Sequence, residues 1–170
     1  EVQTRLIGAD NLDNVLAAIT VGYVNNMPFE QINHALESYI PSNNRSQMAV
    51  TEHNHLVVDA YNANPTSMKA AIDNFKMMEV PHKMAIIGKM GELGDIVEEE
   101  HQKLVDMLTD DAFEEVWLVG EEFQHIPCDF RKFKDVEEVK AAIKACQPQN
   151  RYILIKGSNS NKLFQLPELL

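Results

Sequence analysis

Short apolar runs alternate with longer amphipathic stretches over most of the chain, from residue 48 to residue 157. The apolar runs have the length of strands, and 84–88 has the continuous hydrophobicity of a strand that is buried on both faces of a sheet. The stretches between them repeat apolar residues at helical spacing. The predicted strands are 48–52, 56–61, 84–88, 115–120 and 152–157, and the predicted helices are 66–78, 96–108 and 135–145. This alternation predicts an α/β fold: a Rossmann-like, mainly parallel sheet with helices on both faces, opened by a hairpin of the first two strands.

The first 44 residues show a different pattern, which is almost purely helical. A short strand is expected at 4–8, followed by one helix over 11–24 and a second from Pro28 to Tyr39. A piece of about 40 residues rarely builds a core alone. The turn-rich segment that follows, 41–45, is typical of a linker. We therefore expect residues 1–44 to be the end of a preceding domain with its linker, and residues 45–170 to be the α/β domain.

Composition narrows the class of protein further. The 170 residues carry a formal net charge of −11, which argues against nucleic acid as a partner because binding phosphates needs clustered Lys and Arg. No apolar run approaches the roughly 20 residues that span a bilayer, and no signal peptide is visible. We expect no membrane insertion and a cytoplasmic location. Cys128 and Cys146 are too far apart for a metal motif and are expected to be free thiols.

Polar residues gather where the predicted strand 56–61 ends. Asp59, Tyr61, Asn62 and Asn64 stand close together, directly before a proline and the next helix. In open α/β sheets, ligands bind at the carboxyl ends of the strands. Asn and Asp side chains at such a turn can also bond the local backbone. The pattern alone leaves both a binding site and a plain strand-to-helix turn open.

The residues of this turn, DAYNANP, resemble a signature of the Mur ligases, in particular of the members that add D-alanyl-D-alanine to UDP-N-acetylmuramoyl-tripeptide. The resemblance implies that Asp59 hydrogen-bonds the ribose of ATP. It implies that Tyr61, Asn62 and Asn64 shape the nucleotide and phosphate side of the cleft. Arg45 matches an arginine that precedes the family's hinge and would contact the phosphates or ribose of ATP, since a guanidinium fork suits phosphate.

Residues 8–18, GADNLDNVLAA, resemble the family stretch G-x-H-N-x-x-N-x-x-A-A at the end of the central ATPase domain. The resemblance implies that Asn14 contacts adenine, because an amide offers both a donor and an acceptor. Asp10 stands where the family usually has histidine, so the resemblance assigns it no role. Taken alone, the segment is an ordinary helix start with Asp10 or Asn11 as N-cap.

Residues 88–95, GKMGELGD, form a glycine-rich loop after a strand, and such a loop can offer backbone N–H groups to anions. The loop is neither a dinucleotide fingerprint nor a phosphate loop of the GxxxxGK[ST] type. It resembles the G-x-M-x-E-L-G of the Mur ligases, and His101 matches a recurring histidine there. For Gly91, Gly94 and His101, a structural role and a substrate contact both stay open.

Residues 156–160, KGSNS, resemble the family segment K-G-S-R-S, in which lysine and serine face the incoming substrates. The resemblance implies that Lys156, Ser158 and Ser160 bind a carboxylate of the peptide or of D-alanyl-D-alanine. Taken alone, the segment could also be a solvated loop. Asn159 replaces the usual arginine, so one charge expected from the family is missing.

Other family motifs have no match in this sequence. No GxxGKT/S loop occurs, and the central-domain lysine that the family carbamylates and the glutamate and histidine that hold Mg²⁺ are absent. The chain also lacks a starting methionine. We therefore expect the last part of a three-domain ligase, with no catalytic residue in this chain and no turnover by the fragment alone.

In the full enzyme, the resemblance implies that ATP, with Mg²⁺, phosphorylates the tripeptide carboxylate and that the amine of D-alanyl-D-alanine attacks the acyl phosphate. One alternative is a folyl- or amino-acid-polymerising ligase of the same superfamily. A second is a non-catalytic α/β module that binds a nucleotide or a protein partner.

Overall fold

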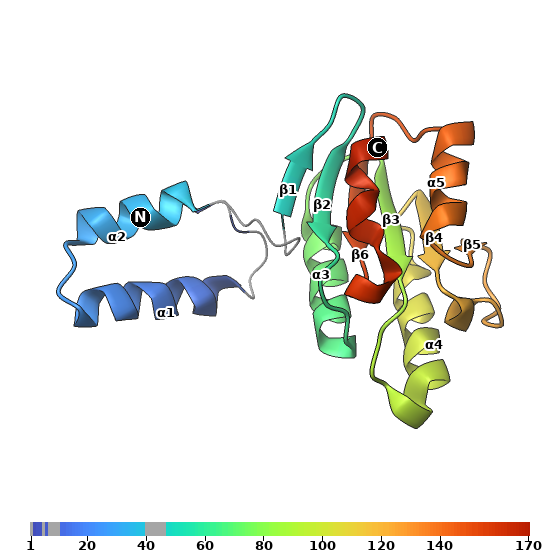
Figure 1. Cartoon of the computed structure of the whole chain (residues 1–170), viewed down its shortest axis with the longest axis horizontal. Helices are drawn as coiled ribbons and strands as arrows, with labels where there is room; N and C mark the ends of the chain where they lie inside the picture. Colours follow the sequence, from blue (N-terminus) through green and yellow to red (C-terminus); the bar gives the residue numbers. More distant parts are fainter. Residues whose placement is uncertain (1, 5, 7–10, 40–46) are drawn as a thin grey trace.

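A mainly parallel sheet with helices on both faces forms the larger part of the molecule (Figure 1). The structure is a computed structural model, which describes residues 2–4, 6, 11–39 and 47–170. In these residues the strand order is β1-β2-β6-β3-β4-β5. The strands are β1 (Gln47–Val50), β2 (His55–Asp59), β3 (Lys83–Gly88), β4 (Glu115–Val119), β5 (Arg131–Phe133) and β6 (Tyr152–Lys156). β1 pairs with β2 antiparallel, as the predicted hairpin requires, and all other pairs are parallel.

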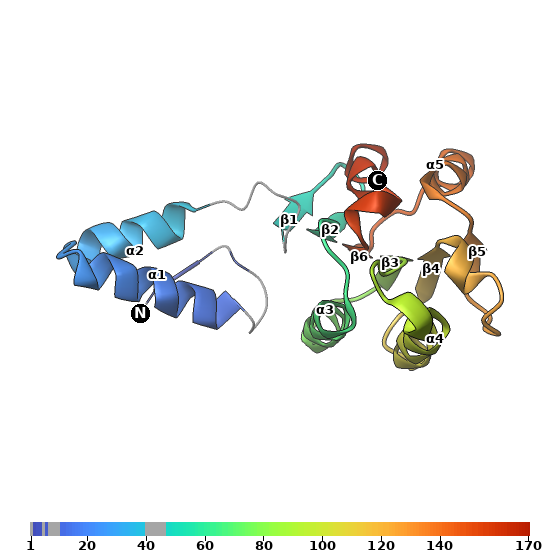
Figure 2. The ribbon, with the colours of Figure 1, turned by 60° about the horizontal axis from the view of Figure 1, so that its bottom comes forward.

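Two helical layers cover the sheet, as predicted (Figure 2). One face carries α3 (Pro65–Met77) and α4 (Val97–Leu108), and the other carries α5 (Val136–Ala145) with the last turns of the chain. Because both faces are covered, both sets of alternating side chains are buried in the inner strands β2, β6, β3 and β4. In β6, Ile153 and Ile155 join the core under α5, whereas Leu154 joins the core under α3 and α4.

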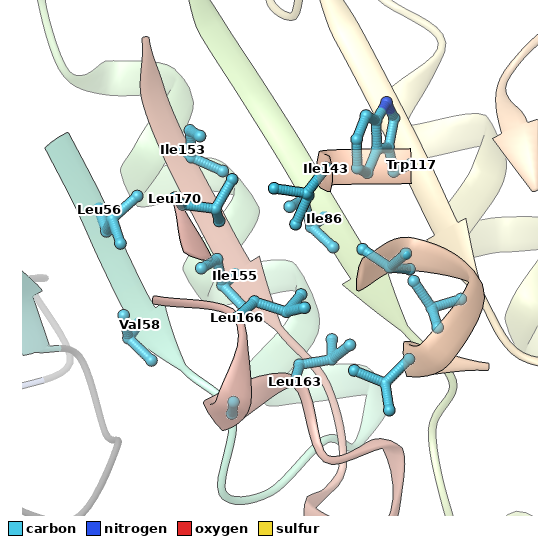
Figure 3. Close-up of a cluster of buried hydrophobic side chains, with 14 of the residues drawn as sticks. Leu56, Val58, Ile86, Trp117, Ile143, Ile153, Ile155, Leu163, Leu166 and Leu170 are labelled. Carbon is cyan, nitrogen blue, oxygen red and sulfur yellow. The ribbon is translucent and has the colours of Figure 1, made fainter. Parts of the chain in front are cut away.

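Figure 3 shows the core on the α5 side. Side chains of four strands point toward α5 and toward leucines of the carboxyl-terminal segment. The labelled residues are Leu56, Val58, Ile86, Trp117, Ile143, Ile153, Ile155, Leu163, Leu166 and Leu170. The carboxyl-terminal segment is therefore part of the fold, since its leucines seal the middle of the sheet.

Several details differ from the sequence-based expectations. β5 was not expected, because it is three residues long and two of them are charged. The three short 3-10 turns between Asn159 and Leu169 were not expected either, since their leucines have no helical or strand period. The helix predicted from residue 96 begins with a 3-10 turn, Gly94–Ile96, and becomes α-helical at Val97.

Near the amino end, α1 (Asn11–Val24) and α2 (Phe29–Ser38) form a hairpin. The two predicted helices are thus present, and the rings of Tyr23 and Phe29 stack with centroids 5.9 Å apart. The strand predicted at 4–8 falls largely outside the described residues, as does the predicted boundary at residues 44 and 45. Within the described chain, no helix has both the length and the apolarity to cross a bilayer.

Candidate functional site

A buried ion pair joins the ends of two neighbouring strands. Asp59 ends β2 and Lys156 ends β6, and the parallel register sets them opposite each other. Lys156 Nζ donates to Asp59 Oδ2 at 2.8 Å and to the Asn62 carbonyl at 2.9 Å. The Lys156 side chain is only 1% exposed and that of Asp59 is 18% exposed. Because an unpaired buried ammonium is very costly, this contact ties the strand ends and the turn after β2 together.

The turn between β2 and α3 is shaped by a capping box. Asn64 Oδ1 accepts from the Ser67 N–H at 2.8 Å, and Ser67 Oγ accepts from the Asn64 N–H at 3.1 Å. Pro65 occupies the first helical position, where its missing N–H costs nothing. The Asn64 side chain is therefore engaged in starting α3. Tyr61 and Asn62 are exposed at the same edge.

The loop after β6 is bound to the loops on either side of it. The Asn159 N–H donates to the Tyr61 carbonyl at 3.1 Å, and the Ser158 N–H donates to the Lys89 carbonyl at 3.4 Å. Ser158 Oγ lies 2.7 Å from Ser160 Oγ and accepts from the Ser160 N–H at 3.2 Å. The loops that follow β2, β6 and β3 therefore form one continuous edge with two hydroxyls on it.

Most of the predicted site residues thus lie at one edge of the sheet. They are Asp59, Tyr61, Asn62, Asn64, Lys156, Ser158 and Ser160. Asn14 is elsewhere, on α1, where its amide donates to Asn11 Oδ1 at 3.1 Å. Arg45 and Asp10 lie outside the described residues.

His101, on α4, is hydrogen-bonded to the loop after β3. The ring is fully buried, its Nε2 accepts from the Met90 N–H at 3.1 Å, and its Nδ1 lies 2.7 Å from the Val97 carbonyl. These two partners require a neutral ring with the proton on Nδ1, since Nε2 accepts and a carbonyl can only accept. Phe123 packs edge-on against it at 4.9 Å between centroids. Of the two roles left open for His101, the structure favours the structural one.

Two hollows open near this edge. A cavity of about 380 Å³ lies between the loops after β3, β4 and β6 and the start of α5, and Lys89, Ser160 and Asn161 line it. A largely apolar groove of about 520 Å³ lies between α3 and α4, lined in part by Met68 and Met90. In the part of the chain that the structure describes, no cluster of three His, Cys, Asp or Glu side chains could hold a metal ion.

Residues 44–159 match the family model of the Mur ligase glutamate ligase domain. The chain belongs to the Mur ligase family. The match covers the whole sheet and confirms the family to which the segments 59–65, 88–95 and 156–159 pointed, whereas the segment 8–18 lies outside it.

Relatives of this Mur ligase chain are substantially longer than the chain itself. The UDP-N-acetylmuramoyl-tripeptide--D-alanyl-D-alanine ligase of Rickettsia prowazekii is 36% identical over 125 residues, covering 70% of this chain and 28% of that protein. A crystal structure of MurF from Acinetobacter baumannii matches with a TM-score of 0.84 and 26% identity, covering 98% of this chain and 39% of that one. MurF from Thermotoga maritima, solved in complex with ADP, matches with a TM-score of 0.79 and 21% identity, covering 96% of this chain and 38% of that one. This chain spans less than two fifths of each.

Sequence reasoning also missed an ion pair between Lys89 and Glu122 at the edge of this Mur ligase domain. Lys89 Nζ lies 2.8 Å from Glu122 Oε1, and the pair links the loop after β3 to the loop after β4. Both residues come within three positions of a strand end, so their place on the edge could have been inferred from the predicted strands. Their pairing could not, because they are 33 residues apart and no motif contains both.

Replacing His101 by leucine is expected to lower the free energy of unfolding by about 1–3 kcal/mol, because the buried Met90 N–H loses its acceptor. Glutamine is the matched control, since its Oε1 can reach the place of Nε2 and accept the same bond. We expect a smaller loss for His101→Gln than for His101→Leu, measured by urea titration with circular dichroism. Equal losses would show that the ring acts through its volume alone.

The Glu122 carboxyl should make the folding stability of the domain depend on pH. Burial raises the pKa of its carboxyl, whereas the hydrogen bond and charge of Lys89, together with a backbone hydrogen bond, lower it, and the net effect is a pKa below its ordinary value of 4.5. A depressed pKa contributes stability above the unfolded value, and this stability is lost as the pH falls through the folded pKa. We expect Glu122→Gln to have a lower melting temperature at neutral pH and the difference from wild type to shrink below about pH 4.5. A difference that is constant with pH would contradict this.

Proposed function

We propose that this chain is the carboxyl-terminal domain, with the last helices of the central ATP-binding domain, of a ligase that adds D-alanyl-D-alanine to UDP-N-acetylmuramoyl-tripeptide. The division at residues 44 and 45 is part of the proposal. The observation that carries it is the Asp59 carboxylate at the sheet edge, one oxygen of which is committed to Lys156. The Asp59 side chain is 18% exposed, so its carboxylate is within reach of a ribose hydroxyl.

The nucleotide side of the site is assigned to the turn after β2. Asp59 would accept from the ribose, the exposed side chains of Tyr61 and Asn62 would lie against the nucleotide, and Asn64 would hold the turn through its helix cap. The structure of the Thermotoga maritima relative in complex with ADP supports a nucleotide as ligand. Arg45 and Asn14 are assigned to phosphate or ribose and to adenine on the family motifs that they match.

The substrate side is assigned to the loop after β6. The Ser158 and Ser160 hydroxyls are reachable from solvent and could donate to a carboxylate of the peptide or of D-alanyl-D-alanine. Asn159, whose side chain is exposed between them, could donate through its amide, although it lacks the charge of the arginine that it replaces.

The reaction that these assignments serve runs in two steps. The tripeptide carboxylate takes the terminal phosphoryl group of ATP, which releases ADP and leaves an acyl phosphate. The dipeptide amine then attacks the acyl carbon, the C–O bond to phosphate breaks, and the amide forms with loss of the amine proton. Mg²⁺ would neutralise phosphate charge in the first step. The described residues offer no ligand cluster for it, so we assign its ligands to the rest of the protein.

This domain would contribute binding and closure to that reaction. Bringing its sheet edge over the nucleotide would exclude water from the acyl phosphate and position the amine. The substrates and ATP are small cytoplasmic molecules, so we place the protein in the cytoplasm. The turn sequence DAYNANP favours the dipeptide-adding ligase over the folyl- or amino-acid-polymerising members and over a non-catalytic module.

The test uses the product of the complete reading frame that contains this chain. Incubated with ATP, Mg²⁺, UDP-N-acetylmuramoyl-tripeptide and D-alanyl-D-alanine, it should release phosphate and form the pentapeptide product, and omitting any one component should stop product formation. The 170-residue chain alone should release no phosphate. Phosphate release by the chain alone, or a complete protein that ligates a different amino compound, would contradict the proposal.

A further inference from the structure

Lys156 has no room to meet a substrate in the way that its motif suggests. It is the largest charged side chain in the buried core of the described chain, and only 1% of its side chain is exposed. Two of its three N–H bonds are directed at atoms of the turn after β2, the Asp59 carboxylate and the Asn62 carbonyl. A carboxylate of a substrate would have to break this arrangement to reach the ammonium group.

We propose that Lys156 is a positioning residue, which orients Asp59 and the turn after β2 toward the nucleotide ribose and does not contact the carboxylate of D-alanyl-D-alanine. This inference rests on the proposed function and specifies the role of one residue within it. The two residues are 97 positions apart in the sequence, and the pairing of β2 with β6 brings them together.

The ion pair between the Lys156 ammonium and the Asp59 carboxylate sets the orientation of Asp59. The ammonium needs an anion because it is buried, so Asp59 Oδ2 is held against it. The carboxylate is planar, so fixing Oδ2 also fixes the direction of Oδ1. The second bond, to the Asn62 carbonyl, holds the turn in the conformation that leaves the Tyr61 and Asn62 side chains exposed. One buried cation thus sets the geometry of three residues on the nucleotide side.

The substrate side does not need Lys156. Ser158 is half-buried and Ser160 is exposed, and both hydroxyls lie beyond the end of the strand. A carboxylate can reach these hydroxyls without disturbing the ion pair. Kinetic measurements can therefore separate the nucleotide side from the substrate side. Substituting Lys156 should change KM for ATP and leave KM for D-alanyl-D-alanine unchanged.

The experiment measures KM for ATP and KM for D-alanyl-D-alanine in the complete ligase. Lys156→Met keeps the side-chain length and removes the charge, and Lys144→Met on the exposed end of α5 is the matched control. We expect Lys156→Met to raise KM for ATP about tenfold, as for loss of one hydrogen bond to a charged group, with KM for the dipeptide unchanged. Lys156→Arg, which keeps the charge, should recover part of the loss.

A double-variant cycle tests whether Lys156 acts through Asp59. If it does, adding Lys156→Met to Asp59→Asn should change KM for ATP by less than about twofold. The double variant removes both charges and so leaves no unpaired buried charge. It can therefore be compared with Asp59→Asn even if Lys156→Met alone is unstable. Independent, multiplicative effects of the two substitutions, or a rise in KM for the dipeptide with KM for ATP unchanged, would overturn the inference.

Failure of the proposed function is a separate outcome. A wild-type protein that does not ligate these substrates would refute the ligase assignment, and calorimetry with ADP on the wild-type and Lys156→Met proteins would then decide the inference. An approximately tenfold weaker ADP affinity in the variant supports positioning. Equal affinities, or no ADP binding by the wild type, would overturn it.

Discussion

Asp59→Ala is expected to lower the free energy of unfolding of the chain by about 3–5 kcal/mol, because it leaves the Lys156 ammonium buried without its anion. The loss is asymmetric between the partners. Lys156→Met leaves the charge on Asp59, whose side chain is 18% exposed and can be hydrated in part, so its cost should be smaller. Urea titration followed by circular dichroism measures both variants.

Asp73→Ala is the matched control for this prediction. It removes the same side chain from an ion pair, the one with Lys69 on the surface of α3, where both partners are well exposed. Exposed pairs contribute about 0–1 kcal/mol, so Asp73→Ala should stay within that range. A cost for Asp59→Ala as small as that for Asp73→Ala, or smaller than that for Lys156→Met, would show that the ammonium finds water or another partner once Asp59 is gone.

Trp117→Ala is expected to cost a similar amount, about 3–5 kcal/mol, through a different mechanism. The indole is buried in the core under α5 (Figure 3), and its ring lies 5.0 Å from the ring of Phe133 between centroids. Its Nε1 donates to Glu115 Oε1 at 2.6 Å, and the Arg131 guanidinium lies 4.7 Å from its ring centre. Truncation therefore removes buried apolar area and leaves a cavity. It also removes the contacts of the indole with Arg131 and Phe133, which help to hold β5 against β4.

Met77→Ala provides the comparison on an exposed position of the same domain. Met77 lies at the end of α3 with most of its side chain in solvent, so we expect a change within about 0.5 kcal/mol. Thermal unfolding of the two variants side by side separates the effect of burial from that of removing a large side chain. A Trp117→Ala melting temperature close to that of Met77→Ala would contradict the core described here.

The sheet could be predicted from the sequence because its inner strands are apolar without interruption. β3 and β6 are covered on both faces, and their runs of Ile, Leu, Met and Ala leave few other interpretations. β5 could not be predicted in the same way, since Arg131 and Lys132 are charged and β5 is an edge strand of the described sheet, paired with β4. Local sequence carries little information where tertiary contacts decide the structure.

The candidate site shows the same division between what is local and what is distant. The helix cap at Asn64 joins residues that are close in the sequence, Asn64 and Ser67. It could therefore be anticipated as a turn whose side chains bond the local backbone. The burial of Lys156 could not, because it depends on which strand lies beside β6. Motif resemblance assigned this lysine to the substrate, whereas its contacts assign it to the turn after β2.

The loops at the sheet edge are joined by main-chain atoms, through the bonds from the Asn159 N–H to the Tyr61 carbonyl and from the Ser158 N–H to the Lys89 carbonyl. Any residue other than proline supplies the same N–H at position 159. Evolution can therefore exchange the side chain there, as arginine for asparagine, and alter what the edge recognises while the architecture beneath it keeps its shape.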